Sequence, residues 1–168
     1  AMQEHTVTAS GETYSLPEPF MVLATQNPIE NEGTYPLPEA QLDRFMLKVM
    51  VEFPSIDELK DIVCRTTMGK RADLTSVLDD KLIFSLREVI SQMPMADSVL
   101  DYALSVVTAT HGDSPYATDM VKNYVEDGAS PRAAQAIVKT AKVRAFLEGR
   151  YNVAFEDVAY VAIPALRH

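Results

Sequence analysis

Three polar residues occupy positions where core packing alone would not need them: Asn27, Arg44 and Arg132. Asn27 follows the apolar run 20–24, and the carboxyl end of a buried strand is where open α/β sheets build ligand sites. Arg44 lies in a short helical segment before a second apolar run. Arg132 lies in the first turn of a predicted helix, where the helix dipole favours an acid over a base. An anion shared between this arginine and the helix N-terminus would explain its position.

Each of these residues also has a plainer interpretation. An Asn before a Pro, as in Asn27-Pro28, often only shapes a turn. Arg44 can form a local ion pair with Asp43, worth well under about 1 kcal/mol if it is exposed. Arg132 can be a solvated surface arginine. The residue types alone leave these alternatives open.

Composition narrows the class of protein. The chain has 168 residues, enough for one domain or two small ones with a real core. Its net charge is −9, and residues 1–53 carry −6 of it, from eight acids against two bases. This acidity argues against an autonomous binder of nucleic acid or anionic membranes, which needs clustered Lys and Arg. The single cysteine, Cys64, excludes an internal disulfide and fits a reducing compartment. No apolar run is long enough for a membrane span and no signal-peptide pattern is present, so we expect a cytoplasmic protein.

The remaining chemistry-bearing residues give weaker signals. The three histidines are scattered and lack metal-ligand spacing. Cys64 falls within a predicted helix with no His nearby, which indicates an inert thiol. The sequence therefore predicts no metal site from this chain's own residues.

The first 53 residues read as a piece of an α/β domain. Two polar, β-prone runs around Ser10-Gly11 predict a projecting hairpin over residues 5–16. The apolar run 20–24 predicts a strand covered on both faces. A Pro-rich loop over 28–38 and a short helix over 39–45 follow, and then a second strand over 46–53.

After Pro54 the pattern becomes helical. Ser55 to Glu58 has the capping-box form S-x-x-E, and Ser130-Pro131 is a strong helix start. We expect about five helices in a compact domain. The apolar faces expected for these helices are, in chain order, Ile56/Leu59/Val63, Ile83/Leu86/Ile90/Met93, Leu100/Leu104/Val107, Ala134/Ile137/Val138/Ala141/Ala145 and Val158/Val161/Ala162/Ala165. A further short helix or strand is expected around 120–125.

Two long motifs occur in this order: ATQNPIENEGTYPLPEAQLDRF and GASPRAAQAIVKTAKVRAFLEGR. Together they closely resemble the MoxR family of AAA+ ATPases, and the terminal FEDVAYVAIPALRH resembles the end of that family's lid domain. The resemblance implies a mainly α chain, in which an α/β remnant of a P-loop AAA+ core precedes an all-α lid helical bundle. It places the core remnant, with its hairpin before the sensor, at residues 1–53 and the lid at residues 54–168.

The resemblance also implies roles for the three polar residues. Asn27 matches the sensor 1 Asn, which positions the attacking water near the γ-phosphate. Arg44 matches the family's candidate arginine finger, acting in trans on nucleotide bound to the neighbouring subunit. Arg132 matches the sensor 2 Arg of the lid, which touches the nucleotide phosphates. The implied cofactors are ATP and Mg²⁺. The implied assembly is a homo-oligomeric ring, expected to be a hexamer, which remodels partner proteins alongside proteins with a von Willebrand factor A domain.

Two expected elements of such an ATPase are not found in the sequence. The phosphate-binding loop needs G-x-x-x-x-G-K-[ST], but Gly69-Lys70 has Cys64 in place of the first Gly and Arg71 in place of Ser or Thr. No apolar strand ends in Asp-Glu, the usual source of the Mg²⁺ ligand. We therefore expect a C-terminal fragment that is inactive alone, with both elements upstream.

Two other function classes remain open on the sequence. One is a non-catalytic protein-interaction module in which the sensor residues are relics. The other is a nucleic-acid motor of a related AAA+ clade, which would need a basic face that the sequence does not show.

Overall fold

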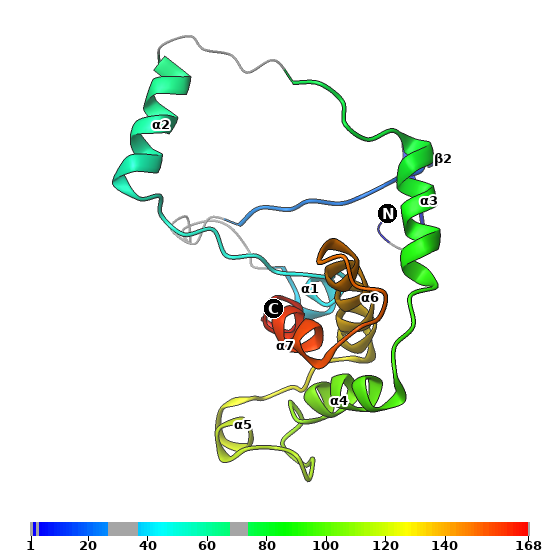
Figure 1. The fold of residues 1–168 in the computed structure, drawn as a ribbon, viewed down its shortest axis with the longest axis vertical. Helices are drawn as coiled ribbons and strands as arrows, with labels where there is room; N and C mark the ends of the chain where they lie inside the picture. Colours follow the sequence, from blue (N-terminus) through cyan, green and yellow to red (C-terminus); the bar gives the residue numbers. More distant parts are fainter. Residues whose placement is uncertain (1, 3, 27–36, 68–73, 168) are drawn as a thin grey trace.

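The chain is mainly helical, with one small sheet near its N-terminus (Figure 1). The computed structural model describes residues 2, 4–26, 37–67 and 74–167. The elements in chain order are β1 (Thr6–Ala9), β2 (Glu12–Ser15), α1 (Glu39–Leu42), α2 (Ile56–Thr67), α3 (Asp80–Ser91), α4 (Asp97–Thr108), α5 (Asp119–Tyr124), α6 (Pro131–Leu147) and α7 (Phe155–Leu166). The predicted fold class, a mainly α chain that begins with a small β element, is confirmed.

The predicted hairpin is present. β1 and β2 pair antiparallel, with Thr6 opposite Ser15 and Ala9 opposite Glu12. Ser10 and Gly11 both take positive φ, at 54° and 85°, which is the backbone that a tight two-residue hairpin turn requires. Almost all of its side chains are exposed, so the hairpin projects as its polar pattern predicted.

The two predicted strands after the hairpin are not formed. Residues 20–24 and 46–53 are extended, and within the described residues the only sheet is the hairpin. Their apolar side chains are open to solvent: Leu23 is 83% exposed, Val51 93% and Phe53 87%. A strand needs a neighbour to take its backbone hydrogen bonds, and the described chain places none beside either run. The strand prediction is therefore wrong for this structure, although the apolar pattern that prompted it is real.

The hydrophobic core is formed where α4, α6 and α7 meet, and α3 also contacts α6. Alanines dominate the contact faces, and small side chains let helices approach closely. The core residues are Met93, Val99, Ala103, Val107, Ala136, Ile137, Ala141, Ala145, Val153, Val158, Val161, Ala162 and Ala165. The predicted buried face of α7 is confirmed in full. In α4 the face is shifted, because Val99 and Ala103 are buried while Leu100 and Leu104 are not.

Local signals explain where most helices begin and end. Ser55 and Glu58 form the predicted capping box: the Ser55 N–H donates to the Glu58 carboxylate at 2.8 Å, and the Glu58 N–H donates to the Ser55 hydroxyl at 3.4 Å. The Ser130 hydroxyl caps α6 by accepting from the Arg132 N–H at 3.1 Å. At its other end α6 stops before Gly149, whose φ is +70°.

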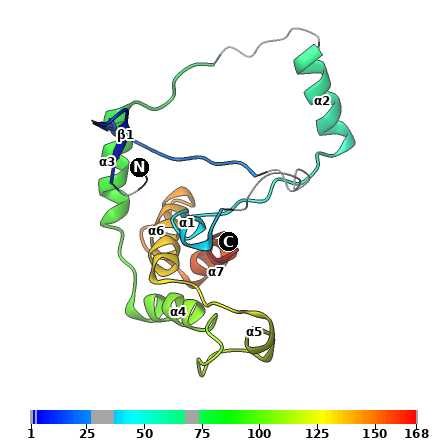
Figure 2. The same cartoon turned by 180° about the vertical axis from the view of Figure 1, so that it is seen from behind.

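The helical part is less compact than the sequence suggested. α2 has no buried residue and lies apart from α4, α6 and α7 (Figures 1 and 2). Around residues 120–125, where the sequence left a short helix or a strand open, the structure has the short helix α5, capped by the Thr118 hydroxyl. The shared core thus comes from the helices after residue 90, while α2 contributes nothing to it.

Candidate functional site

Arg132 is in the first turn of α6, as predicted, and faces an anion that belongs to the chain itself. Its Nη1 donates to Oδ2 of Asp43 at 2.8 Å, and the two side chains are 45% and 26% exposed. The Ser130 hydroxyl donates to the other carboxylate oxygen, Oδ1, at 2.5 Å. The Asp43 carboxylate therefore occupies the positive end of the α6 dipole, where a negative charge is stabilised.

Arg44 lies just beyond α1 and is paired with a different residue from the one expected. Its Nη1 is 3.5 Å from Oε1 of Glu4, near the start of the chain, and its side chain is 37% exposed. The local Asp43–Arg44 ion pair, the plainer interpretation of this motif, is wrong because Asp43 is directed to α6 instead. At 3.5 Å between two half-exposed side chains, the contact with Glu4 contributes little stability.

Asn27, the third predicted site residue, lies outside the described residues, as does most of the Pro-rich loop that follows it. Its role stays a prediction. Of the predicted residues, Arg132 thus contacts Asp43, which directly precedes the second predicted residue, Arg44. Figure 1 labels α1, which ends directly before Asp43, together with α6 and α7.

The sequence did not predict that Asp43 contacts Arg132 of α6. Asp43 lies 89 residues before Arg132, and no periodic or capping pattern links positions that far apart. The only local signal was that an acid stands directly before Arg44, which favoured the wrong partner.

A second missed feature is a buried carboxylate. Asp157, in the first turn of α7, has no solvent exposure and accepts from Arg144 at 2.8 Å and from Arg150 at 2.5 and 2.7 Å. The Ala154 N–H also donates to it, at 2.9 Å. Burial raises the pKa of Asp157, but the hydrogen bonds from Arg150, Ala154 and Arg144 together outweigh burial and hold that pKa below its usual value.

The Asp157 cluster is best explained as structural. Its carboxylate already has four donors, and the Arg144 guanidinium lies 4.2 Å from the centre of the Tyr160 ring. The cluster joins the C-terminal part of α6, the following loop and the start of α7.

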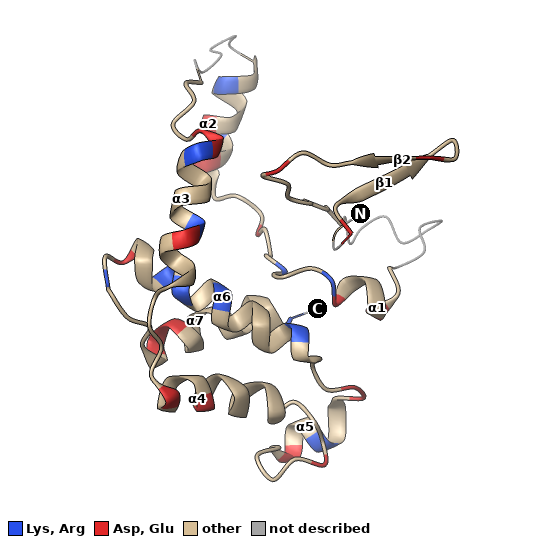
Figure 3. Cartoon of the chain, turned by 90° about the vertical axis from the view of Figure 1, so that its right-hand side faces the viewer, with Lys and Arg blue, Asp and Glu red and all other residues tan. Residues whose placement is uncertain are grey.

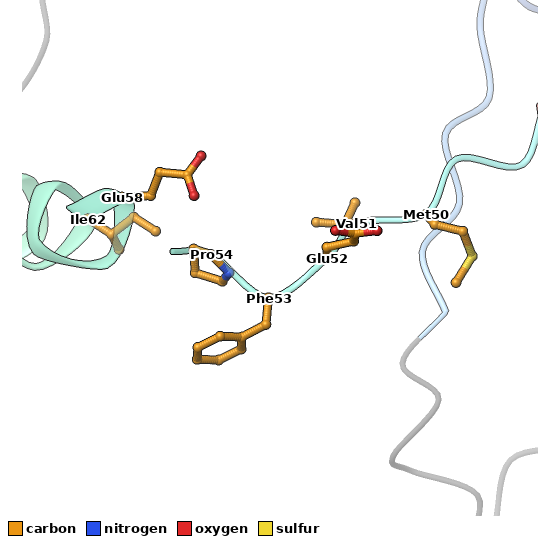
Figure 4. A pocket seen from close by; sticks show the side chains of 7 residues that line it. All are labelled: Met50, Val51, Glu52, Phe53, Pro54, Glu58 and Ile62. Atoms are coloured by element: carbon orange, nitrogen blue, oxygen red, sulfur yellow. The ribbon is translucent and has the colours of Figure 1, made fainter. Parts of the chain in front are cut away.

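A hollow among the described residues lies elsewhere. It has a volume of about 550 Å³ and is open, between the extended residues 50–54 and the first turns of α2. Figure 4 shows side chains spread along the extended chain rather than converging on one point. One of its acids, Glu58, is engaged in the capping box, where hydrogen bonds from the Ser55 hydroxyl and N–H lower its pKa. The hollow contains none of the predicted site residues.

Donor chemistry decides what the candidate site can hold. An exposed edge of the Arg132 guanidinium at a helix N-terminus fits a phosphate group, which accepts several N–H bonds. A divalent cation needs converging oxygen ligands, and the part of the chain that the structure describes has no cluster of three or more His, Cys, Asp or Glu. No helix among the described residues is long and apolar enough to cross a membrane.

Comparisons with known proteins bear on the class of protein. Residues 1–47 match the model of the "ATPase family associated with various cellular activities (AAA)", and residues 117–168 match the AAA lid domain. The two matches place the chain in the AAA class.

Within that class the chain is similar to proteins of the MoxR family. It is 40% identical over 169 residues to Chaperone MoxR1 of Mycobacterium tuberculosis, covering 99% of this chain and 44% of that protein. It is 37% identical to the uncharacterized protein YeaC of Bacillus subtilis, covering 100% of this chain and 50% of the relative. A crystal structure from Cytophaga hutchinsonii ATCC 33406, named "putative ATPase", superposes with a TM-score of 0.89 at 37% identity, over 98% of this chain and 50% of that one. The chain spans about half the length of these relatives.

Proposed function

We propose that this chain is the C-terminal part of a MoxR-type AAA+ ATPase, in which ATP binding and hydrolysis drive chaperone-like remodelling or maturation of partner proteins. The observation that carries the proposal is the contact between the two family motifs. Asp43, of the Leu42-Asp43-Arg44-Phe45 motif, lies 2.8 Å from Arg132, of the Ser130-Pro131-Arg132 motif. The two arginines assigned to the nucleotide are thus held in one small region.

The proposed roles follow from the positions of the side chains. Arg132, with nearly half of its side chain exposed, contacts the phosphates of nucleotide bound to its own subunit. Asn27 orients the attacking water. Bound ATP supplies the phosphoryl group and Mg²⁺ offsets its charge, while the protein contributes positioning and charge stabilisation. The ligands for the metal lie outside this chain.

Arg44 is proposed to act on the neighbouring subunit of a homo-oligomeric ring, with a hexamer expected. The partial exposure of Arg44 and the long contact with Glu4 support this, because such a contact can be exchanged for a phosphate at little energetic cost. The proposed setting is the cytoplasm, with von Willebrand factor A domain proteins as partners.

We propose the division of the chain into a core remnant, residues 1–53, and a lid, residues 54–168. The exposed apolar runs 20–24 and 46–53 support a core completed by further strands, since soluble proteins rarely leave such runs uncovered. The relatives, about twice as long, have room for those strands and for the phosphate-binding loop.

A second candidate function is a non-catalytic interaction module. One observation favours it: Arg132 already has an anionic partner, Asp43, within the chain. If the sensor residues are relics, removing them leaves nucleotide handling unchanged.

Two substitutions in the full-length protein separate the candidates. Arg44→Ala should lower ATP turnover by roughly 10³-fold or more, as for other arginine fingers, while ATP affinity changes less than about twofold. Arg132→Ala should weaken ATP binding by roughly tenfold, because a charge-assisted contact to phosphate is lost. The measurements are steady-state hydrolysis and the Kd of a fluorescent non-hydrolysable ATP analogue.

The matched control is Arg65→Ala. Arg65 is exposed on α2 and pairs only loosely with Asp61, at 3.8 Å, so both measurements should stay at wild-type levels. Unchanged affinity and turnover in Arg132→Ala would instead support the interaction module. Equal loss of binding in Arg44→Ala would contradict its action in trans.

A further inference from the structure

The Asp43 carboxylate connects two parts of the chain through both of its oxygens. Oδ2 accepts from Arg132 Nη1 at 2.8 Å and Oδ1 accepts from the Ser130 hydroxyl at 2.5 Å. Ser130 is the N-cap of α6 and Arg132 is in its first turn, so the carboxylate contacts the N-terminal end of that helix. An exposed ion pair alone would be weak, but two short hydrogen bonds donated to a partly buried carboxylate fix its orientation.

Ser130 extends the connection to the backbone of α6. Its hydroxyl donates to Asp43 and accepts from the Arg132 N–H at 3.1 Å. The direction of the hydroxyl, and with it the helix cap, therefore depends on the carboxylate. Through Ser130, Asp43 acts on the main chain of Arg132 as well as on its side chain.

A second bond holds the same segment against the end of α7. The Lys48 N–H donates to the Pro164 carbonyl at 2.8 Å. Arg44 lies between the two attachment points, Asp43 and Lys48. The short segment 43–48 is thus hydrogen-bonded to both α6 and α7, with Arg44 inside it.

Asp43 engages Arg132 on one side only. Its carboxylate accepts one hydrogen bond from Arg132, through Nη1, whereas a guanidinium has five N–H donors in a rigid plane. The Arg132 side chain remains 45% exposed. A carboxylate in this position restricts the rotamer of Arg132 and leaves donors free for a second acceptor.

We propose that Asp43 is a positioning residue, which orients Arg132 toward nucleotide phosphate and mechanically couples the Arg44 segment to the first turn of α6. The first part of this proposal, the orientation of Arg132 toward phosphate, rests on the proposed function. In this role Asp43 does not contact the nucleotide; it acts through Arg132 and Ser130. If Asp43 instead competed with phosphate for Arg132, removing its charge would raise the affinity for ATP rather than lower it.

The test uses the full-length protein and the variant Asp43→Asn, which keeps the shape of the side chain and removes its charge. The first readout is amide hydrogen exchange at the start of α6 without nucleotide. We expect exchange about tenfold faster at residues 132–134, because the cap at Ser130 loses its orientation. Ser130→Ala, which removes the hydroxyl itself, should give a similar or larger increase.

The second readout is the Kd of a non-hydrolysable ATP analogue in a double-mutant cycle with Arg132→Ala. Asp43→Asn should weaken binding by about fivefold to tenfold in the wild-type background. In the Arg132→Ala background the same substitution should have no effect on analogue binding, because the proposed effect of Asp43 on the nucleotide requires the Arg132 side chain. A purely structural role would weaken binding equally in both backgrounds.

Asp57→Asn is the matched control, since Asp57 is an exposed acid on α2 that pairs with Lys60 at 3.1 Å. It should change neither readout. Tighter analogue binding in Asp43→Asn would overturn the proposal in favour of competition, and unchanged exchange at the start of α6 would overturn the coupling. If wild-type protein bound no nucleotide, the proposed function would fail, while the exchange experiment would still decide whether Asp43 holds α6.

Discussion

At the scale of single residues, Asp157 and Asp43 show two uses of a carboxylate at a helix N-terminus. Asp157 is not exposed to solvent, and its carboxylate accepts hydrogen bonds from two arginines and a backbone N–H. Asp43 is 26% exposed and leaves its arginine partner open to solvent. The first arrangement suits stability, and the second suits a site that meets a ligand.

Replacing the buried acid should weaken the fold of the helical part. Asp157→Asn keeps the size of the side chain but leaves Arg144 and Arg150 without their counter-charge. We expect a loss of about 3 kcal/mol in the free energy of unfolding, typical for removing one partner of a buried ion pair. Urea denaturation of the 168-residue chain, followed by circular dichroism, measures it. Asp57→Asn, at an exposed pair, should unfold like wild type, and equal midpoints for the two variants would contradict the structural role.

The same residue predicts a pH dependence with a definite sign. The pKa of Asp157 in the fold lies below its ordinary value of 3.8, so the unfolded chain binds its proton more tightly. The stabilisation from this group is therefore complete above about pH 4 and is lost as pH falls through the folded pKa. The difference in stability between wild type and Asp157→Asn should be constant from pH 7 to 5 and shrink below pH 4. A difference that shrinks between pH 7 and 5 would assign the effect to another group.

At the scale of elements, the end of α6 offers a clean test of backbone conformation. Gly149 has φ +70° and no atom within 4 Å of the place where a Cβ would lie, so Ala there meets no clash and only an unfavourable backbone. Gly149→Ala should destabilise the chain by about 1 kcal/mol in thermal or urea unfolding. Gly112→Ala is the control: its φ is not positive and its nearest contact would be an ordinary 3.7 Å from Lys122 Cα. Equal effects of the two substitutions would show that the positive φ is not responsible.

The helices were predictable because their signals are local. Ser55 with Glu58, Ser130 with Pro131 and the apolar spacing of α7 all act within a few residues, and each prediction is confirmed. The strands at 20–24 and 46–53 were not predictable in the same way, because pairing depends on a neighbour that no local pattern supplies. An apolar run indicates that a segment is to be buried, but it does not identify the element that buries it.

The candidate site was predictable only in part, for the same reason. Arg132 was found because it breaks a local rule at a helix N-terminus. Asp43 as its partner was not found, since 89 residues separate the two. Local reasoning also paired Arg44 with its neighbour in sequence, whereas the structure pairs it with Glu4, 40 residues away.

At the scale of the whole molecule, the distribution of charge bears on the class of partner. α6 carries four basic residues and no acid, and it lies near α4, which carries only acids (Figure 3). Three of the four are engaged within the chain: Arg132 with Asp43, Lys142 with the Ser91 carbonyl and Arg144 with Asp157. Four cations spread along one helix, three of them in contact with groups of the chain itself, do not form the clustered basic face that a phosphate backbone needs, which agrees with the net charge of −9 in disfavouring a nucleic-acid motor.

The exposed apolar runs lead to a prediction about the chain on its own. Leu23, Val51 and Phe53 are each more than four-fifths exposed, so the 168-residue chain should bind a hydrophobic dye such as ANS strongly. With no phosphate-binding loop in the sequence, it should also show negligible ATP hydrolysis at any concentration, with Mg²⁺ present. The full-length protein, measured in parallel, should bind less dye per mole and hydrolyse ATP. Robust turnover by the isolated chain would mean that its own residues complete the site, and the split between this chain and further core segments would then be wrong.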